Sequence, residues 1–331
     1  MEEFKVIEFQ QTRDFSRKLN TTFEFLRQNF KSLGKSILYI SGPSVLVASL
    51  LIGSFMGEFL TLTQSLQSQA GDVETLGDYF LTLSFWAQIL AMLIFFFISF
   101  VVTIATINCY INVYVEKRTN KIEVQEVWDR VRITFWNYAG TTILFFIAYV
   151  IVVILLVIPM FILGAISPFL IFFGAIFLFV GLFYLAISVS LTYFIQSHEK
   201  KSFLAAMVRS YRLVNNGKWW STFGLLFLLQ MITGISSYIF LIPYYIIVLT
   251  SSLHSVSTGN PLEMSSTMVT VSVICFTLYY MAQMLLYSLP HVGIAFQYFN
   301  LVELKEARGL LSQIETIGQA TTDPNRPEET Y

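Results

Sequence analysis

The stretch from Ile133 to Ser197 contains no Asp, Glu, Lys, Arg or His, and its middle reads VIPMFILGAISPFL over residues 157–170. As a single α-helix, rising about 1.5 Å per residue, it would be roughly three times as long as a bilayer core is thick. The chain must therefore turn back once. Pro159 and Pro168 lack backbone donors, and we place the turn between them. The stretch predicts a hairpin of two membrane-spanning helices.

Four other uncharged stretches are each long enough for at least one crossing, which takes about 20 apolar residues. They are Ser36–Gly57, Tyr79–Val115, Trp219–Leu253 and Met264–Pro290. The chain is 55% hydrophobic and only 12% charged, with a mean hydropathy of +0.66, whereas about a quarter of a soluble domain is charged. We expect an all-α integral membrane protein of six transmembrane helices, spanning residues 36–57, 80–109, 141–159, 168–194, 223–250 and 268–299.

The basic residues predict the orientation. All 20 Lys and Arg residues fall before the first span, between the second and third, between the fourth and fifth, or after the sixth. The other three loops contain none. Lys and Arg collect in short loops on the cytoplasmic side, so both termini are predicted to be cytoplasmic. The first 35 residues are amphipathic and show no secretory signal, so the first span is expected to be a retained anchor of a multi-pass membrane protein.

Three basic segments that precede hairpins resemble one another and predict a threefold internal repeat. These segments are residues 22–34, 127–140 and 203–224. Alignment on the glycine that ends each segment places in one column Phe30, Trp136 and Trp220. We expect each unit to contain one amphipathic helix in the membrane interface and two spanning helices. The alternative is that these residues form only the aromatic belt and basic flank of ordinary transmembrane helices.

In the first segment, apolar side chains recur at spacings of three and four, while Arg27 lies on the other side of the helix. Such a helix would lay its apolar face against acyl chains and its cations among anionic headgroups. The same reasoning applies to the other two segments. The candidate residues for binding lipids or partner proteins are Arg27, Phe30, Arg132, Trp136, Arg209, Arg212, Trp219 and Trp220.

Arg209 and Arg212 in the third segment are three residues apart and share a helix face. Guanidinium groups bind phosphate through paired hydrogen bonds, so the two arginines predict a headgroup site on the cytoplasmic leaflet. Trp219 and Trp220 would fix the depth of this segment. The alternative is that both arginines serve only to orient the protein in the membrane.

The chain divides into four regions by composition. Residues 1–35 form the amphipathic N-terminal segment, 36–302 the six-helix membrane domain, and 303–318 the cytoplasmic end of the last helix. Residues 319–331 are mostly Thr, Asp, Pro, Asn and Glu, which cannot bury a core, and we expect a disordered tail.

The third segment resembles a known group of membrane proteins. The residues that carry the resemblance are Ala206–Leu213 (AMVRSYRL), Trp219–Trp220 and Phe223–Leu226 (FGLL). They are similar to the membrane domain attached to some bacterial glycerophosphoryl diester phosphodiesterases and to stand-alone relatives of unknown function. The resemblance implies a helical membrane module of six helices. It implies no phosphodiesterase activity, because the hydrolase is a separate soluble barrel in those enzymes.

The sequence predicts no catalytic, metal or cofactor site. His198, His254 and His291 are separated along the chain, and the two cysteines have no ligand-like spacing. We expect His198 to be solvated in a loop. His291 is the one ionisable residue near membrane depth, which makes it a functional candidate, although a hydrogen bond at a proline kink is the simpler interpretation.

Three glutamines also lie at membrane depth, namely Gln88, Gln230 and Gln283. They are expected either to form hydrogen bonds between helices or to contribute to a polar site.

The leading hypothesis is a non-enzymatic, multi-pass module of the bacterial inner membrane. It would organise anionic lipids of the cytoplasmic leaflet or partner subunits of a membrane complex. The alternative is a transporter or permease-like component for a small or amphiphilic solute. A polar passage inside a threefold repeat would favour the transporter, whereas an apolar, filled centre would favour the module. The net charge of −1 gives no reason to expect nucleic acid as a partner.

Overall fold

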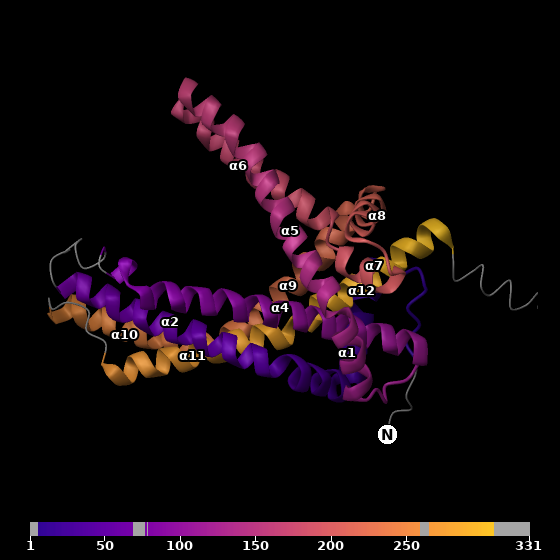
Figure 1. Cartoon of the computed structure of the whole chain (residues 1–331), viewed down its shortest axis with the longest axis horizontal. Helices are drawn as coiled ribbons and strands as arrows, with labels where there is room; N and C mark the ends of the chain where they lie inside the picture. The colour runs from indigo at the N-terminus through magenta and orange to yellow at the C-terminus, as the bar shows by residue number, and fades with distance from the viewer. Residues whose placement is uncertain (1–5, 69–76, 78, 259–264, 308–331) are drawn as a thin grey trace, which may run out of the picture.

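The computed structural model describes residues 6–68, 77, 79–258 and 265–307, and within these ranges every regular element is a helix (Figure 1). Six largely helical stretches of the described residues are long and apolar enough to cross a membrane. They are Phe15–Leu62, Leu83–Lys117, Val124–Ile166, Phe169–Glu199, Trp219–Ser257 and Ser266–Glu306. The predicted all-α fold of six spanning helices is confirmed. In hydrocarbon only a helix or a closed barrel satisfies all backbone polar groups, which accounts for this outcome.

The helices follow one another with few irregular residues between them. In chain order they are α1 (Phe15–Ser36), the π-helical turn η1 (Ile37–Ser41), α2 (Gly42–Ser68), α4 (Leu83–Lys117), α5 (Val124–Ile166), α6 (Pro168–Ser188), α7 (Thr192–Glu199), α8 (Phe203–Asn215), α9 (Trp219–Tyr238), the 3₁₀ turn η2 (Ile239–Leu241), α10 (Ile242–Thr258), α11 (Ser266–Leu286) and α12 (Ser288–Glu306).

Two groups of helices extend in different directions from a common base (Figure 1). Helices α2, α10, α11 and the first half of α4 form one bundle. The hairpin of α5 and α6 points away from it. At the base, α1, α7 and α8 gather with the second halves of α4 and α12. We call this base the charged end, because it carries the basic loops at Lys117–Lys121 and Lys200–Lys201.

The predicted end of the third span at Pro159 is wrong. Helix α5 continues through Pro159 to Ile166, and the chain turns at Ser167, whose backbone is extended (φ −157°, ψ 129°). A proline removes only its own N–H, and transmembrane helices tolerate that loss when neighbouring groups compensate. Pro168 takes the first position of α6, where its missing donor costs nothing. The predicted hairpin is present, with its turn at the later proline.

A stripe of small residues holds α2 against α11. A Cβ atom added to Gly53 would lie 2.8 Å from the carbonyl oxygen of Val273, and one added to Gly57 would lie 2.7 Å from its Cγ2. The Thr277 hydroxyl also reaches the Ser49 carbonyl oxygen at 3.4 Å. Glycines spaced by four residues allow this close approach of two helices in a membrane.

The charged end has a packed aromatic core. Phe9, from the segment before α1, stacks on Phe296 with 4.4 Å between ring centroids and also contacts Phe25, Tyr114 and Phe299. Its segment is held by backbone donors, since Ile7 N–H donates to the Tyr114 hydroxyl at 3.0 Å. Aromatic pairs in these geometries contribute about 0.5–1.5 kcal/mol each beyond burial. This core fixes α1, α4 and α12 relative to one another.

The three segments of the predicted repeat are all helical but differ in how they continue. The first, in α1, passes through η1 into α2, and the second is the beginning of α5, so neither is a separate helix. Only the third forms a separate short helix, α8, which a turn at Asn216–Lys218 divides from α9. The threefold repeat stays a prediction.

The last helix ends earlier than expected. Helix α12 ends at Glu306, and Ala307 caps it with a left-handed backbone (φ 46°). The remainder of the predicted helix end, 308–318, and the predicted disordered tail, 319–331, lie outside the described residues.

Replacement of Gly53 by leucine tests the α2–α11 contact. We expect Gly53→Leu to lower the free energy of unfolding by about 1–3 kcal/mol, because the side chain must push against the Val273 backbone. Gly234→Leu is the matched control, since a Cβ at Gly234 meets no atom within 4 Å. Thermal unfolding in detergent, followed by circular dichroism, measures the difference. Equal midpoints for the two variants would contradict the contact.

Candidate functional site

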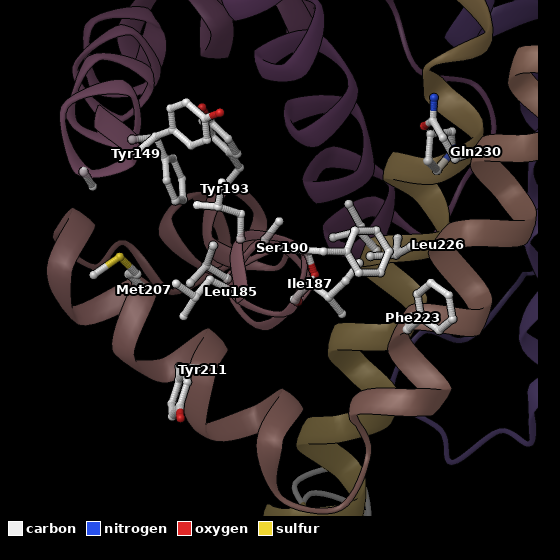
Figure 2. Close-up of a pocket in the computed structure, with 18 of the residues that line it drawn as sticks. Tyr149, Leu185, Ile187, Ser190, Tyr193, Met207, Tyr211, Phe223, Leu226 and Gln230 are labelled. Carbon is white, nitrogen blue, oxygen red and sulfur yellow. Dashed lines mark hydrogen bonds between the residues drawn. The ribbon is translucent and has the colours of Figure 1, made fainter. Parts of the chain in front are cut away.

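A cavity of about 1240 Å³ lies where the α5–α6 hairpin leaves the base of the molecule. Its walls come from α4, α5, α6, α7, α8, α9 and the region around the α11–α12 junction. Figure 2 shows side chains from these walls, with Tyr149 of α5, Met207 of α8 and Leu226 of α9 around the same space. We call it the hairpin cavity. It is larger than the 300–1,000 Å³ usual for sites that hold a drug-sized ligand.

The walls of the hairpin cavity are mostly aliphatic and aromatic. The phenylalanines among them are Phe100, Phe145, Phe179, Phe183, Phe223 and Phe227. Of the described residues that line the cavity, Arg212 is the one Lys, Arg, Asp or Glu. Two of the other predicted site residues, Gln230 and His291, line it as well. An apolar space with a few polar groups is the usual form of a binding site for an apolar or amphiphilic molecule.

Arg209 and Arg212 have different surroundings although they are three residues apart. Arg209 is largely buried, donates from Nε to Glu199 Oε1, and pairs with Glu306 at 2.9 Å. Burial acts to lower the pKa of Arg209, but the bonds to Glu199 and Glu306 outweigh it and raise that pKa. Its guanidinium is therefore occupied by two carboxylates, and the predicted phosphate site of two arginines is reduced to one.

Arg212 is exposed, and among the described residues its guanidinium forms no ion pair or hydrogen bond. Its backbone carbonyl accepts a hydrogen bond from Lys305 Nζ, which brings a second cation to the same place. The edge of the hairpin cavity at the charged end is thus basic. An anion that entered there would meet Arg212 and Lys305 without competing with a carboxylate for Arg212.

Trp219 packs against Phe223, one of the residues that line the hairpin cavity. Its ring stacks on Tyr184 at 5.4 Å and on Phe223 at 5.5 Å, and its indole N–H donates to the Tyr184 carbonyl at 3.3 Å. Tyr184 also donates its hydroxyl to Asn215 Oδ1 at 2.5 Å, which ties α6 to the end of α8. These contacts hold the hairpin, α8 and α9 together at the base. The predicted role of Trp219 in fixing the membrane depth of this segment stays a prediction.

His291 and Gln230 lie deeper in the hairpin cavity. Gln297 donates to the Thr222 hydroxyl at 2.7 Å, which sets α12 beside α9. At about 1.5 Å per residue, His291 lies about 9 Å from Gln297 along α12, and Gln230 lies about 12 Å from Thr222 along α9. Both lie on the side away from the charged end. The two side chains therefore line the cavity at similar depth.

The other two predicted intramembrane polar residues do not line this cavity. Gln88 donates to Glu58 Oε1 at 3.1 Å and so joins α4 to α2, as a glutamine between helices is expected to do. Gln283 is on α11, where its buried Oε1 forms no hydrogen bond with any described residue. We have no physical account of that unpaired oxygen.

The remaining predicted lipid-binding residues lie on the outer surface. Phe30, Trp136 and Trp220, which the repeat aligns in one column, have exposed fractions of 75%, 78% and 76%. Arg27 and Arg132 are exposed as well. Exposed aromatic side chains beside cations are typical of the interface between membrane and water. The structure does not bring these residues together into one site.

Sequence reasoning missed a buried lysine. Lys18 is 2% exposed, and its ammonium donates to Gln297 Oε1 at 2.7 Å and to Ser221 Oγ at 2.9 Å. Because Gln297 also bonds Thr222, this network ties α1 to α9 and α12. Lys18 occupies the buried face of α1 with Phe25 and Leu33, at helical spacing. The spacing of apolar residues predicted a different face of this helix. The contacts of Lys18 with Ser221 and Gln297, far along the chain, identify the buried face.

The expectation that His198 is solvated is wrong. Its ring lies against Phe194 and Phe299, and Nδ1 is 2.9 Å from Asn112 Oδ1. The adjacent Glu199 accepts from the Tyr298 hydroxyl at 2.6 Å as well as from Arg209. A run of charges suggested a solvated loop, but His198 and Glu199 end helix α7, which packs against α4 and α12. His198 and Glu199 dock α7 onto the base.

No group of three or more His, Cys, Asp or Glu side chains in the described part of the chain is arranged to hold a metal ion. Cys109 and Cys275 are both buried and free. The apolar walls and the basic edge of the hairpin cavity suit it chemically to an amphiphile.

Comparison with protein-family models, with curated proteins and with solved structures finds no match. The resemblance of the third segment to the phosphodiesterase membrane domain stays a prediction. The function is argued below from this chain's own geometry.

Proposed function

We propose that this protein is a non-enzymatic module of the bacterial inner membrane that holds an anionic phospholipid of the cytoplasmic leaflet. The acyl chains occupy the hairpin cavity, and the phosphate lies against Arg212 at the basic edge. The observation that carries the proposal is an apolar cavity between spanning helices with a single arginine, free of carboxylates, among its described lining residues.

The apolar walls supply most of the binding. Burial of hydrocarbon from water does not drive acyl chains into a cavity inside a membrane, so close packing against aromatic side chains must do so. The hairpin cavity offers phenylalanines on both the hairpin and α9. The basic edge then selects the headgroup, since a basic residue near an anionic lipid surface contributes about 1 kcal/mol.

The filled base of the molecule supports a binding module over a transporter. Phe9, Phe25 and Phe296 pack where α1, α4 and α12 meet, and all three side chains are buried. A solute that passed through the described part of this base would have to displace a close-packed core.

Arg212→Gln tests the proposal. Retained phosphatidylglycerol should fall about fivefold per protein, the equivalent of about 1 kcal/mol. The measurement is mass spectrometry of lipids that co-purify with the protein in mild detergent. Lys121→Gln is the matched control, because it removes an exposed cation from the loop between α4 and α5.

Arg209→Gln separates binding from folding. It should retain as much phosphatidylglycerol as the wild type but unfold at a lower temperature, because Glu199 and Glu306 lose their partner. If Arg212→Gln retains as much phosphatidylglycerol as Lys121→Gln, the proposal is wrong.

The proposed leaflet depends on the orientation of the chain, which the basic loops support. A cysteine in place of Ser257 should react with an impermeant thiol reagent in intact spheroplasts, and one in place of Thr119 only after lysis. The native cysteines Cys109 and Cys275 are buried and give a low background. Labelling at position 119 without lysis would reverse the orientation and move the proposed lipid to the other leaflet.

A further inference from the structure

The inner end of the hairpin cavity contains two polar side chains without partners. His291 is 5% exposed and lines the cavity, and its imidazole forms no hydrogen bond with any described residue. Its nearest aromatic contact is the ring of Tyr287, at 4.7 Å. Gln230 lines the same space, and its amide likewise has no hydrogen bond within the described part of the chain. Gln88, by contrast, is paired with Glu58.

Unpaired polar groups at this depth are costly. An amide or imidazole that loses water without gaining a hydrogen bond is destabilising by a few kcal/mol, and hydrocarbon offers no replacement. Gln230 is not part of the buried contact between α9 and α12, which Leu225 and Leu229 form with Leu289. Both residues line a space that a ligand can fill.

An ordinary phospholipid held at Arg212 does not satisfy these groups. Lys305, which contacts the Arg212 backbone, is about 21 Å along α12 from His291. The phosphate and ester groups of such a lipid stay near the basic edge, and only methylene groups pass His291. The polar pair requires a ligand whose own polar group lies at membrane depth.

The chemistry of His291 and Gln230 restricts which polar group the ligand can carry. A neutral imidazole has one donor and one acceptor, and a glutamine amide has both. A charged ligand group would have to leave water for an apolar space that holds no opposite charge at this depth. The group that fits is neutral and forms hydrogen bonds, such as a hydroxyl or a carbonyl.

We propose that His291 and Gln230 form a subsite for the neutral head of a membrane lipid that carries a hydroxyl or carbonyl group, such as a diacylglycerol or an isoprenoid quinone. The apolar tail lies along the phenylalanine walls. This inference deepens the proposed function and rests on it, because both assign a lipid to the hairpin cavity. It adds a second point of selection. Arg212 selects a lipid with an anionic headgroup at the basic edge, and His291 and Gln230 select a lipid with a neutral head at the inner end.

The test uses the full chain in nanodiscs of phosphatidylcholine, with dioleoylglycerol and decylubiquinone as separate probes. Native mass spectrometry measures the retained probe. The wild type should retain at least one of them, and Gln230→Leu and His291→Phe should each reduce retention about fivefold, as expected for the loss of a hydrogen bond. Retention of dioleoylglycerol alone identifies a hydroxyl ligand, and retention of decylubiquinone alone a carbonyl ligand.

Gln88→Leu is the matched control, since it removes a glutamine of similar character outside the cavity. Gln230 is exposed in the structure, so Gln230→Leu remains informative if His291→Phe does not fold. Equal retention by Gln230→Leu and Gln88→Leu overturns the subsite. So does a wild type that binds neither probe while it still retains phosphatidylglycerol through Arg212, and in that case the proposed function stands.

Discussion

The hydrocarbon of a membrane provides no hydrogen-bond partners, and the rest of this structure depends on that constraint. Every described element is helical because a helix pairs its backbone within itself. The basic residues gather beyond the spans for the same reason. Inside the spans, polar side chains pair across helices, as Gln88 does with Glu58 and Gln297 with Thr222. Gln283 Oε1 and both polar atoms of the Asn108 side chain have no partner among the described residues. Gln230 and His291 are further exceptions, and these two line the hairpin cavity.

The α5–α6 hairpin is much less buried against other helices than the other spans are. In the most hydrophobic windows of its two helices no residue is buried, whereas 28–33% of the corresponding windows in the other four spans are buried. Its own contact is close, because a Cβ at Gly174 would lie 2.6 Å from Met160. It meets the remaining helices mainly near its base (Figure 1). Few contacts beyond the base restrain it, and the proposed lipid would add contacts between the hairpin and α9.

The fold was predictable from the sequence because the hydrocarbon of the membrane acts on each span separately, through the span's own length and composition. Uncharged stretches the length of a bilayer identify spans without any knowledge of their packing. The error at Pro159 has the same origin, since a proline that would end a helix in water is tolerated in a membrane. The continuity of α1 with α2 was not predictable, because an interfacial helix and the extension of a spanning helix share one amphipathic pattern.

The candidate site was predictable only in part. Arg212, Gln230 and His291 were chosen for their chemistry, and the structure brings these three to one cavity. Arg209 has the same chemistry as Arg212 but is occupied by Glu306, which is distant in the sequence. Lys18 is likewise buried by partners on α9 and α12. Pairing between distant segments decides which cation remains available, and a single sequence does not contain that information.

The most direct test of the central claim is an electron cryomicroscopy structure in nanodiscs that contain phosphatidylglycerol, with a bound antibody fragment to aid alignment. We expect density for a lipid between the α5–α6 hairpin and α9, with its phosphate beside Arg212. A hairpin packed directly against α9, with its phenylalanines filling the space and Arg212 facing water, would contradict it.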